Sequence, residues 1–244
     1  MNWKICLKAR LLPKNSGKEI SLFLSERESP DTRLCPYETV SFDLFDTLVF
    51  RSVREPAAVF SVVENTLQRP GFAQKRKAAE ARARQEKHRR TGSWEVTFGE
   101  IYRYLDNDPE AMETELAAEL ALCHPDPVTA ALWEAVGRQG KRRVITSDMY
   151  LPRETLARIL HHCGFQGWEK LLVSCEYGVS KADGGLFQVL RREVGTGAVL
   201  HIGDHYESDV LSARKNGLDA AWYRREQVQK SVFYAPHGAE RRQA

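Results

Sequence analysis

The sequence contains few cysteines and no pair of them at short spacing. Its 5 cysteines lie far apart, none forms a C-x-x-C motif, and no histidine stands at the spacing of a metal-ligand set. This pattern argues against a disulfide framework and against a zinc-binding module. We expect reduced thiols and a cytoplasmic location.

Charge of one sign is not in excess either. The chain carries 36 Lys and Arg against 33 Asp and Glu, a formal net charge of +3. This balance argues against wholesale nucleic-acid binding and is compatible with an anionic small molecule. The one biased segment, residues 73–90, has no aromatic residue for base stacking, and its alanines favour a solvated helix face over a phosphate-binding surface. We therefore predict no nucleic-acid partner.

A long uninterrupted apolar run is also missing at the amino terminus. The first residues are basic, and Lys8 and Arg10 interrupt their apolar stretch. We therefore expect neither a signal-peptide core nor a transmembrane segment, while docking on a membrane complex stays compatible.

Short apolar runs that alternate with helical stretches are what the sequence does contain. Helices are expected to begin near Pro152, Asp183 and Tyr206. Strands separated by helices of this length predict a parallel sheet covered on both faces, because parallel neighbours need crossover connections. The fold class is therefore α/β, with a Rossmann-like parallel sheet. The predicted strands are Thr39–Phe45, Arg142–Ser147, Lys170–Ser174, Ala198–Asp204 and Asp219–Tyr223.

The interval after the first strand is far too long for a simple connection and carries helix signals of its own. Thr97 with Glu100 forms a capping-box pattern, and Asp108 and Asp126 each precede a proline. We predict a helical cap inserted after the first strand. The expected units are an N-terminal extension (1–38), a core (39–50 and 140–225), the helical cap (51–139) and a C-terminal tail (226–244).

Polar residues stand at the carboxyl ends of three predicted strands. Asp43, Ser147 and Asp204 hold these positions, and ligands of parallel α/β sheets bind at this edge. Lys181 and Asp209 stand near the starts of two predicted helices. Each residue alone has an ordinary structural explanation, as a strand-end cap, an exposed lysine or a helix-dipole partner. Their joint placement favours a single polar site.

The order of these residues resembles the haloacid dehalogenase superfamily, a group of mostly magnesium-dependent phosphohydrolases. The resemblance covers roughly residues 39–222. It implies a nucleophilic Asp43 that forms an aspartyl-phosphate, with Ser147 and Lys181 binding the transferring phosphoryl group. It also implies Mg²⁺ held by Asp43, Asp209, Asp204 and the backbone carbonyl of Phe45. The motifs that carry it are "DLFDT", "VITSD", "GVSKADGGLF" and "GDHYESD".

The first motif departs from the phosphatase pattern. The second aspartate, which serves those enzymes as general acid, is replaced here by Phe45, and Asp46 stands where the family usually has glycine. Residues three apart at a strand exit do not face the same way, so Asp46 does not automatically replace the missing acid. Asp46, a cap residue, a water and the substrate are the candidate proton donors. An aromatic residue at this position is similar to the dehalogenases of the superfamily, so 2-haloacid dehalogenation is a rival. A binding module with lost turnover is the third alternative.

A longer stretch looks like a subgroup attached to bacterial glycosyltransferases of surface-polysaccharide synthesis. This resemblance implies a phosphorylated sugar, polyol or glycan intermediate as substrate, and a glycosyltransferase or polysaccharide-synthesis machinery as partner. It makes Thr47, Arg51, Asp148 and Tyr150 candidate substrate-binding residues. The strings that carry it are "VSFDLFDTLVFRSVREPAAVF", "SDMYLP" and "HIGDHYESDV".

Overall fold

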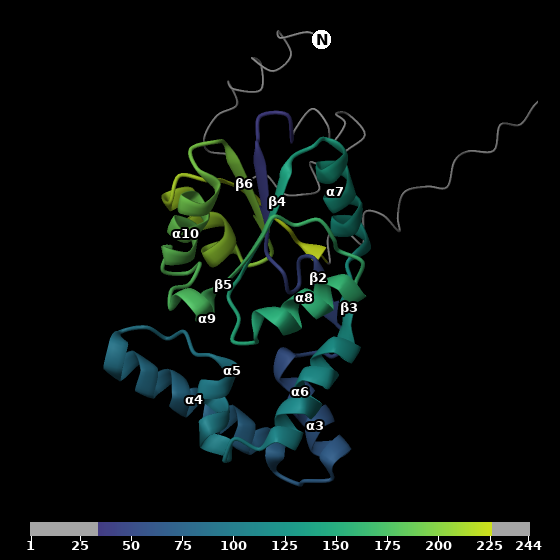
Figure 1. Ribbon diagram of the computed structural model, residues 1–244, viewed down its shortest axis with the longest axis vertical. Helices are drawn as coiled ribbons and strands as arrows, with labels where there is room; N and C mark the ends of the chain where they lie inside the picture. Colours follow the sequence, from purple (N-terminus) through teal and green to yellow (C-terminus); the bar gives the residue numbers. More distant parts are fainter. Residues whose placement is uncertain (1–33, 226–244) are drawn as a thin grey trace, which may run out of the picture.

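The computed structural model describes residues 34–225 and shows two stacked parts. A sheet flanked by helices forms the upper part in Figure 1, and a group of helices forms the lower part. The predicted tail (226–244) and nearly all of the predicted extension (1–38) lie outside the described residues. Within residues 34–225, no helix is both long and apolar enough to cross a bilayer.

The sheet has five strands in the order β5-β4-β1-β6-β7, and all neighbouring strands are parallel. The first strand of the chain is therefore central, and its Phe42 pairs with Ile145 on one side and Ile202 on the other. This arrangement confirms the predicted Rossmann-like α/β fold. The strands are β1 (Thr39–Phe42), β4 (Arg142–Ser147), β5 (Lys170–Val173), β6 (Val199–Gly203) and β7 (Asp219–Trp222).

Helices cover both faces of this sheet, which explains why its strands read as nearly continuous apolar runs. Successive residues of β4 face opposite sides: Val144 packs in one apolar cluster with Leu190, and Ile145 packs in the other with Leu156. Figure 1 shows α7 and α10 on opposite sides of the strands. The covering elements are α7 (Pro127–Arg138), α8 (Arg153–His162), α9 (Ser174–Tyr177), α10 (Gly185–Val194), the π-helix η4 (Tyr206–Leu211) and α11 (Ser212–Lys215).

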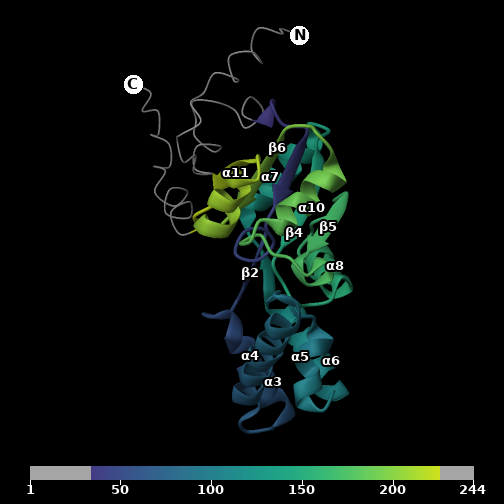
Figure 2. The ribbon, with the colours of Figure 1, turned by 90° about the vertical axis from the view of Figure 1, so that its left-hand side faces the viewer.

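The lower part consists of helices inserted after the first strand. Two short antiparallel strands, β2 (Val49–Arg51) and β3 (Cys123–Pro125), connect the two parts. Figure 2 shows the two parts one above the other. The predicted insert (51–139) also includes α7, which packs beside β4 rather than in the lower part, so we propose placing the cap boundary at β2 and β3. The inserted elements are η2 (Pro56–Ala58), α3 (Val59–Leu67), α4 (Phe72–Thr91), α5 (Phe98–Tyr102), η3 (Arg103–Leu105) and α6 (Pro109–Leu122).

The capping signals in the sequence are confirmed in the structure. The Thr97 side chain accepts a hydrogen bond from the Glu100 backbone, and the Glu100 carboxylate accepts one from the Thr97 backbone. Asp108 and Asp126 cap α6 and α7, each with a proline in the first turn. Local hydrogen bonds thus fix where these helices begin.

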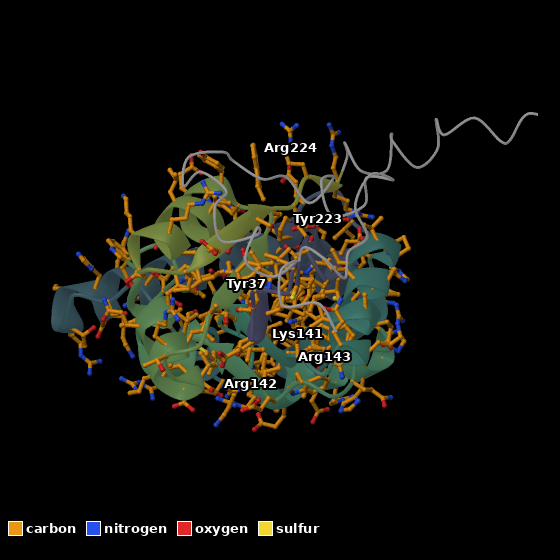
Figure 3. All side chains as sticks on the ribbon, turned by 90° about the horizontal axis from the view of Figure 1, so that it is seen from above. Tyr37, Lys141, Arg142, Arg143, Tyr223 and Arg224 are labelled. Atoms are coloured by element: carbon orange, nitrogen blue, oxygen red, sulfur yellow. The ribbon has the colours of Figure 1, made fainter. Side chains whose placement is uncertain are left out.

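Figure 3 looks onto the end of the sheet that is remote from the inserted helices. Three consecutive cations stand there at the beginning of β4, and each has a partner. Lys141 donates to the Tyr37 carbonyl at 2.6 Å, Arg142 forms two 2.6 Å hydrogen bonds with Glu169, and Arg143 lies 4.8 Å from the Trp133 ring. These cations bind neighbouring residues of the protein at this end of the sheet. The opposite end of the sheet is left for a ligand.

A buried ion pair holds the inserted helices together. Arg76 of α4 donates two 2.8 Å hydrogen bonds to Glu115 of α6, and both side chains are 0% exposed. The Tyr102 hydroxyl donates to the same carboxylate at 2.7 Å, and the guanidinium lies 4.4 Å from the Phe60 ring. Most other cations of α4 face solvent, as expected for a solvated helix.

Replacing Arg76 by methionine leaves the Glu115 carboxylate buried without its cation. We expect the free energy of unfolding, measured by urea titration, to fall by about 3–5 kcal/mol, because a broken buried pair keeps an uncompensated charge. The control is Arg89→Met, which removes the same charge from an exposed position of α4 and is expected to cost under about 0.5 kcal/mol. Equal losses in the two variants would contradict a stabilising role of this pair.

Candidate active site

A cleft of about 430 Å³ lies between the sheet and the inserted helices. The strand order places the carboxyl ends of β4, β1 and β6 side by side, and these ends carry Ser147, Asp43 and Asp204. All of the predicted site residues line the cleft except Thr47. Segments more than 150 residues apart in the sequence therefore meet at one edge of the sheet.

Three carboxylates form the centre of the cleft. One oxygen each from Asp43, Asp204 and Asp209 can be chosen so that all lie within 4.8 Å of one another. Burial and the neighbouring carboxylates raise the pKa of Asp43 well above its usual range and that of Asp204 to about 6. Hard oxygen donors gathered in this way fit a small divalent cation such as Mg²⁺, which would remove their mutual repulsion.

A buried ammonium group partly compensates this cluster. The Nζ of Lys181 contacts the carboxylate of Asp43 and lies 2.6 Å from Oδ1 of Asp209. Burial opposes the charged form of Lys181, but the neighbouring carboxylates outweigh it and raise its pKa. Burial likewise opposes ionisation of Asp209, yet the lysine charge holds its pKa below the usual range. Lys181 and Asp209 are thus fixed as an ion pair.

The loop that carries Lys181 is held by Asp148. The Asp148 carboxylate accepts hydrogen bonds at 2.8 and 3.1 Å from the Lys181 backbone N–H. Ser212 completes this support, because its hydroxyl donates to the Lys181 carbonyl at 2.5 Å. Asp148, a predicted substrate-binding residue, lines the cleft with its carboxylate engaged in positioning the lysine.

The glycine of the "GDHYESD" motif is required by close packing. A Cβ atom at Gly203 would overlap the Asp209 side chain, whose approach therefore depends on glycine. Asp209 stands on η4, and its Oδ2 accepts a 2.9 Å hydrogen bond from the His205 backbone. Gly203 at the end of β6 thus lets η4 bring the Asp209 carboxylate close to those of Asp43 and Asp204.

The loop after β1 explains the unusual first motif. Asp46 has φ of +58°, in the left-handed region that glycine favours and aspartate tolerates. Its exposed side chain stands at the cleft, whereas the Phe45 ring lies under the Arg51 guanidinium at 3.8 Å. β1 ends at Phe42 rather than at the predicted Phe45, because the chain turns here and the Leu48 backbone bonds back to Leu44.

Two other predicted substrate-binding residues are engaged with protein partners. Thr47 is buried outside the cleft lining, and its hydroxyl donates to Asp204 at 3.4 Å. Arg51 forms two hydrogen bonds with Glu119 of α6, at 2.7 and 3.2 Å. Tyr150 lines the cleft, and its backbone carbonyl accepts a hydrogen bond from the backbone N–H of Phe98 on the inserted helix α5.

A polar network inside the sheet was not predicted from the sequence. His201 of β6 is fully buried, with Nε2 at 3.2 Å from Asp209 and Nδ1 at 3.0 Å from the Ser41 hydroxyl. The Ser41 hydroxyl lies 2.9 Å from that of Thr146. Burial lowers the pKa of His201, so a neutral ring with its proton on Nε2 donates to Asp209 and accepts from Ser41.

This network joins three neighbouring strands to the carboxylate cluster. Its signal in the sequence is a set of polar residues in the middle of apolar strands, where a buried polar group needs a partner. Because the partners stand on strands far apart in the sequence, their pairing appears only with the register, which places Ser41 opposite His201.

Replacing His201 by phenylalanine keeps a ring in the core and removes both hydrogen bonds. We expect the free energy of unfolding in urea to fall by about 1–3 kcal/mol, because Ser41 and Asp209 lose a buried partner. His201→Gln, which can still donate to Asp209, is expected to recover part of this loss. His162→Phe at an exposed position of α8 is the control, and a loss as small as that control's would refute the network.

Comparison with known proteins agrees with this fold. The family model of a haloacid dehalogenase-like hydrolase matches residues 37–217. A search of the curated proteins finds no match.

Solved structures share the fold at low sequence identity. The 2-haloacid dehalogenase from Pseudomonas syringae pv. Tomato DC3000 aligns with a TM-score of 0.57 and 19% identity, over 77% of this chain and 86% of that one. YfnB from Bacillus subtilis, bound to magnesium, gives 0.54 and 14% over 81% and 99%. L-2-haloacid dehalogenase from Xanthobacter autotrophicus gives 0.54 and 14% over 82% and 83%. Because the family model spans well over half of the sequence, the chain belongs to the haloacid dehalogenase-like hydrolases.

Proposed function

We propose that this hydrolase is a magnesium-dependent phosphohydrolase that acts on a phosphorylated small molecule through Asp43. The observation that carries the proposal is the group of three carboxylates within 4.8 Å, which the single ammonium of Lys181 does not neutralise. A bound cation would neutralise the cluster and the negative charge of a phosphoryl group. The magnesium bound to the Bacillus subtilis relative supports the same choice of ion.

The arrangement of side chains in the cleft supports phosphoryl transfer. An oxygen of Asp43 forms a bond to phosphorus while the bond between phosphorus and the alcohol oxygen breaks, giving an aspartyl-phosphate and the alcohol. The Lys181 ammonium holds Asp43 and offsets the charge of the phosphoryl oxygens, and the Ser147 hydroxyl at the end of β4 donates to them. Water then attacks phosphorus, and the bond to Asp43 breaks to release phosphate.

Protonation of the leaving alcohol is the weak step of this mechanism. Phe45 replaces the usual acid, and Asp46 at the cleft is the other carboxyl group of the same motif besides Asp43. Missing general-acid help costs about 10²- to 10⁴-fold in rate, so substrates with good leaving groups are favoured. A sugar, polyol or glycan phosphate and a glycosyltransferase partner remain proposals that rest on the sequence motifs.

Dehalogenation of a 2-haloacid is the second candidate, favoured by Phe45. That reaction uses an aspartate that attacks carbon and needs neither the missing acid nor a cation. The carboxylate cluster argues against it, because Asp204 and Asp209 beside Asp43 repel each other without an ion. A binding module without turnover is the third candidate.

Phosphate release from a panel of sugar and polyol phosphates and an activated aryl phosphate tests the proposal. We expect release that requires Mg²⁺, stops with chelator and is abolished in Asp43→Asn, which keeps the shape of the nucleophile but not its charge. Halide release from a 2-haloacid in chelator would establish the rival reaction. Magnesium or phosphate binding without any turnover would establish the binding module.

The Asp46→Asn variant separates the sources of the proton. If Asp46 is the acid, we expect kcat for a sugar phosphate to fall by about 10²-fold or more, and kcat for an activated aryl phosphate to change little, because the better leaving group needs less protonation. Equal kcat values for wild type and variant on both substrates would assign the proton to another group.

A further inference from the structure

We infer that the leaving group of the substrate is an uncharged, hydroxyl-bearing alcohol, and that the cleft rejects a second anionic group. This inference rests on the proposed phosphohydrolase function and adds the class of substrate. It follows from the pairing of charges in the part of the cleft beyond the carboxylate cluster.

Acidic side chains dominate the lining of the cleft. Among the described residues that line it, seven carry a carboxylate and two, Lys181 and Arg51, carry a permanent positive charge. Lys181 contacts Asp43 and Asp209 and is therefore placed for the transferring phosphoryl group. A second anionic group on the substrate would have to bind elsewhere in the cleft.

The cation placed for that task is Arg51, and α6 neutralises it. Both hydrogen bonds of its fork go to the Glu119 carboxylate, and the two side chains are 7% and 1% exposed. Phe45 covers the guanidinium from one side at 3.8 Å. A buried bidentate pair of this kind presents no net charge to a ligand. Arg51 therefore lines the cleft without serving as an anion-binding group.

A further carboxylate of the lining, on α4, is paired with cations as well. Glu80 accepts hydrogen bonds from Arg76 at 3.1 Å and from Arg84 at 2.8 and 2.9 Å, so its carboxylate is also compensated. The aromatic residues Phe60 and Tyr150 also line the cleft. Carboxylate oxygens accept from hydroxyl groups, and aromatic rings pack against their carbon skeletons. A neutral alcohol satisfies both, whereas a carboxylate or second phosphate meets oxygen acceptors.

Three phosphate esters of different charge test this inference. We compare kcat/KM for glycerol 3-phosphate, 3-phosphoglycerate and ethanolamine phosphate in Mg²⁺, because the first two differ by a neutral or anionic carbon terminus. We expect glycerol 3-phosphate to exceed 3-phosphoglycerate by at least about tenfold, since the carboxylate of 3-phosphoglycerate would lose water and find Arg51 already paired with Glu119. Ethanolamine phosphate is expected to fall below glycerol 3-phosphate, because the Glu80 and Glu119 carboxylates are already paired with arginines and give its ammonium group no free partner.

The Glu119→Gln variant should shift this preference. It retains the shape of the carboxylate and one acceptor but leaves Arg51 with a net charge, so the ratio of 3-phosphoglycerate to glycerol 3-phosphate is expected to rise by about tenfold. Glu113→Gln removes the same charge from the exposed side of α6 and should leave the ratio unchanged. Thermal melts by circular dichroism identify a variant that does not fold; Glu80→Gln then replaces Glu119→Gln, with a rise in the same direction expected.

The outcomes separate this inference from the function on which it rests. Absence of magnesium-dependent phosphate release from every ester would overturn the proposed function and this inference with it. Turnover with 3-phosphoglycerate or ethanolamine phosphate as the better substrate would overturn the inference alone. A ratio that is unchanged in a folded Glu119 or Glu80 variant would do the same.

Discussion

The site depends on one buried ammonium group placed between two carboxylates. Lys181 touches Asp43 from β1 and Asp209 from η4, and none of the three is accessible enough for water to replace these contacts. Removing Lys181 would leave two buried carboxylates without their cation, which is far costlier than the pairing itself is stabilising. The surrounding structure therefore has to deliver all three together, and much of it can be understood from that requirement.

Three parts of the fold meet this requirement. The sheet order makes β1 central, so Asp43 lies between the strand ends that carry Ser147 and Asp204. Gly203 leaves room for Asp209, and Asp148 holds the backbone of Lys181. Inside the sheet, a series of hydrogen bonds runs from Thr146 through Ser41 and His201 to Asp209 and fixes the orientation of its carboxylate. The Asp209 carboxylate is thus held by Lys181 in the cleft and by His201 in the core.

The sequence was sufficient for the parts of the fold that depend on local signals. β4 begins and ends at the predicted residues, Arg142 and Ser147, because both of its faces are buried and its pattern is unambiguous. The helix caps at Thr97, Asp108 and Asp126 are equally local. The family motifs then indicated which strand ends would meet. The position of α7 beside the sheet was not predicted, since a helix pattern does not specify which neighbour its apolar face covers.

Pairings between distant residues were beyond the sequence, and they change the interpretation of the site. Arg51 was expected to bind substrate because it follows the first motif, but its nearest charge, Glu119, is contributed by a helix 68 residues later. The same holds for Arg76, whose cationic neighbours in the sequence face solvent while it is buried against Glu115. An arginine is informative about a ligand only once its carboxylate partners are known. In this cleft those partners belong to the inserted helices, so the residues that hold the cap together also set the charge that a substrate meets.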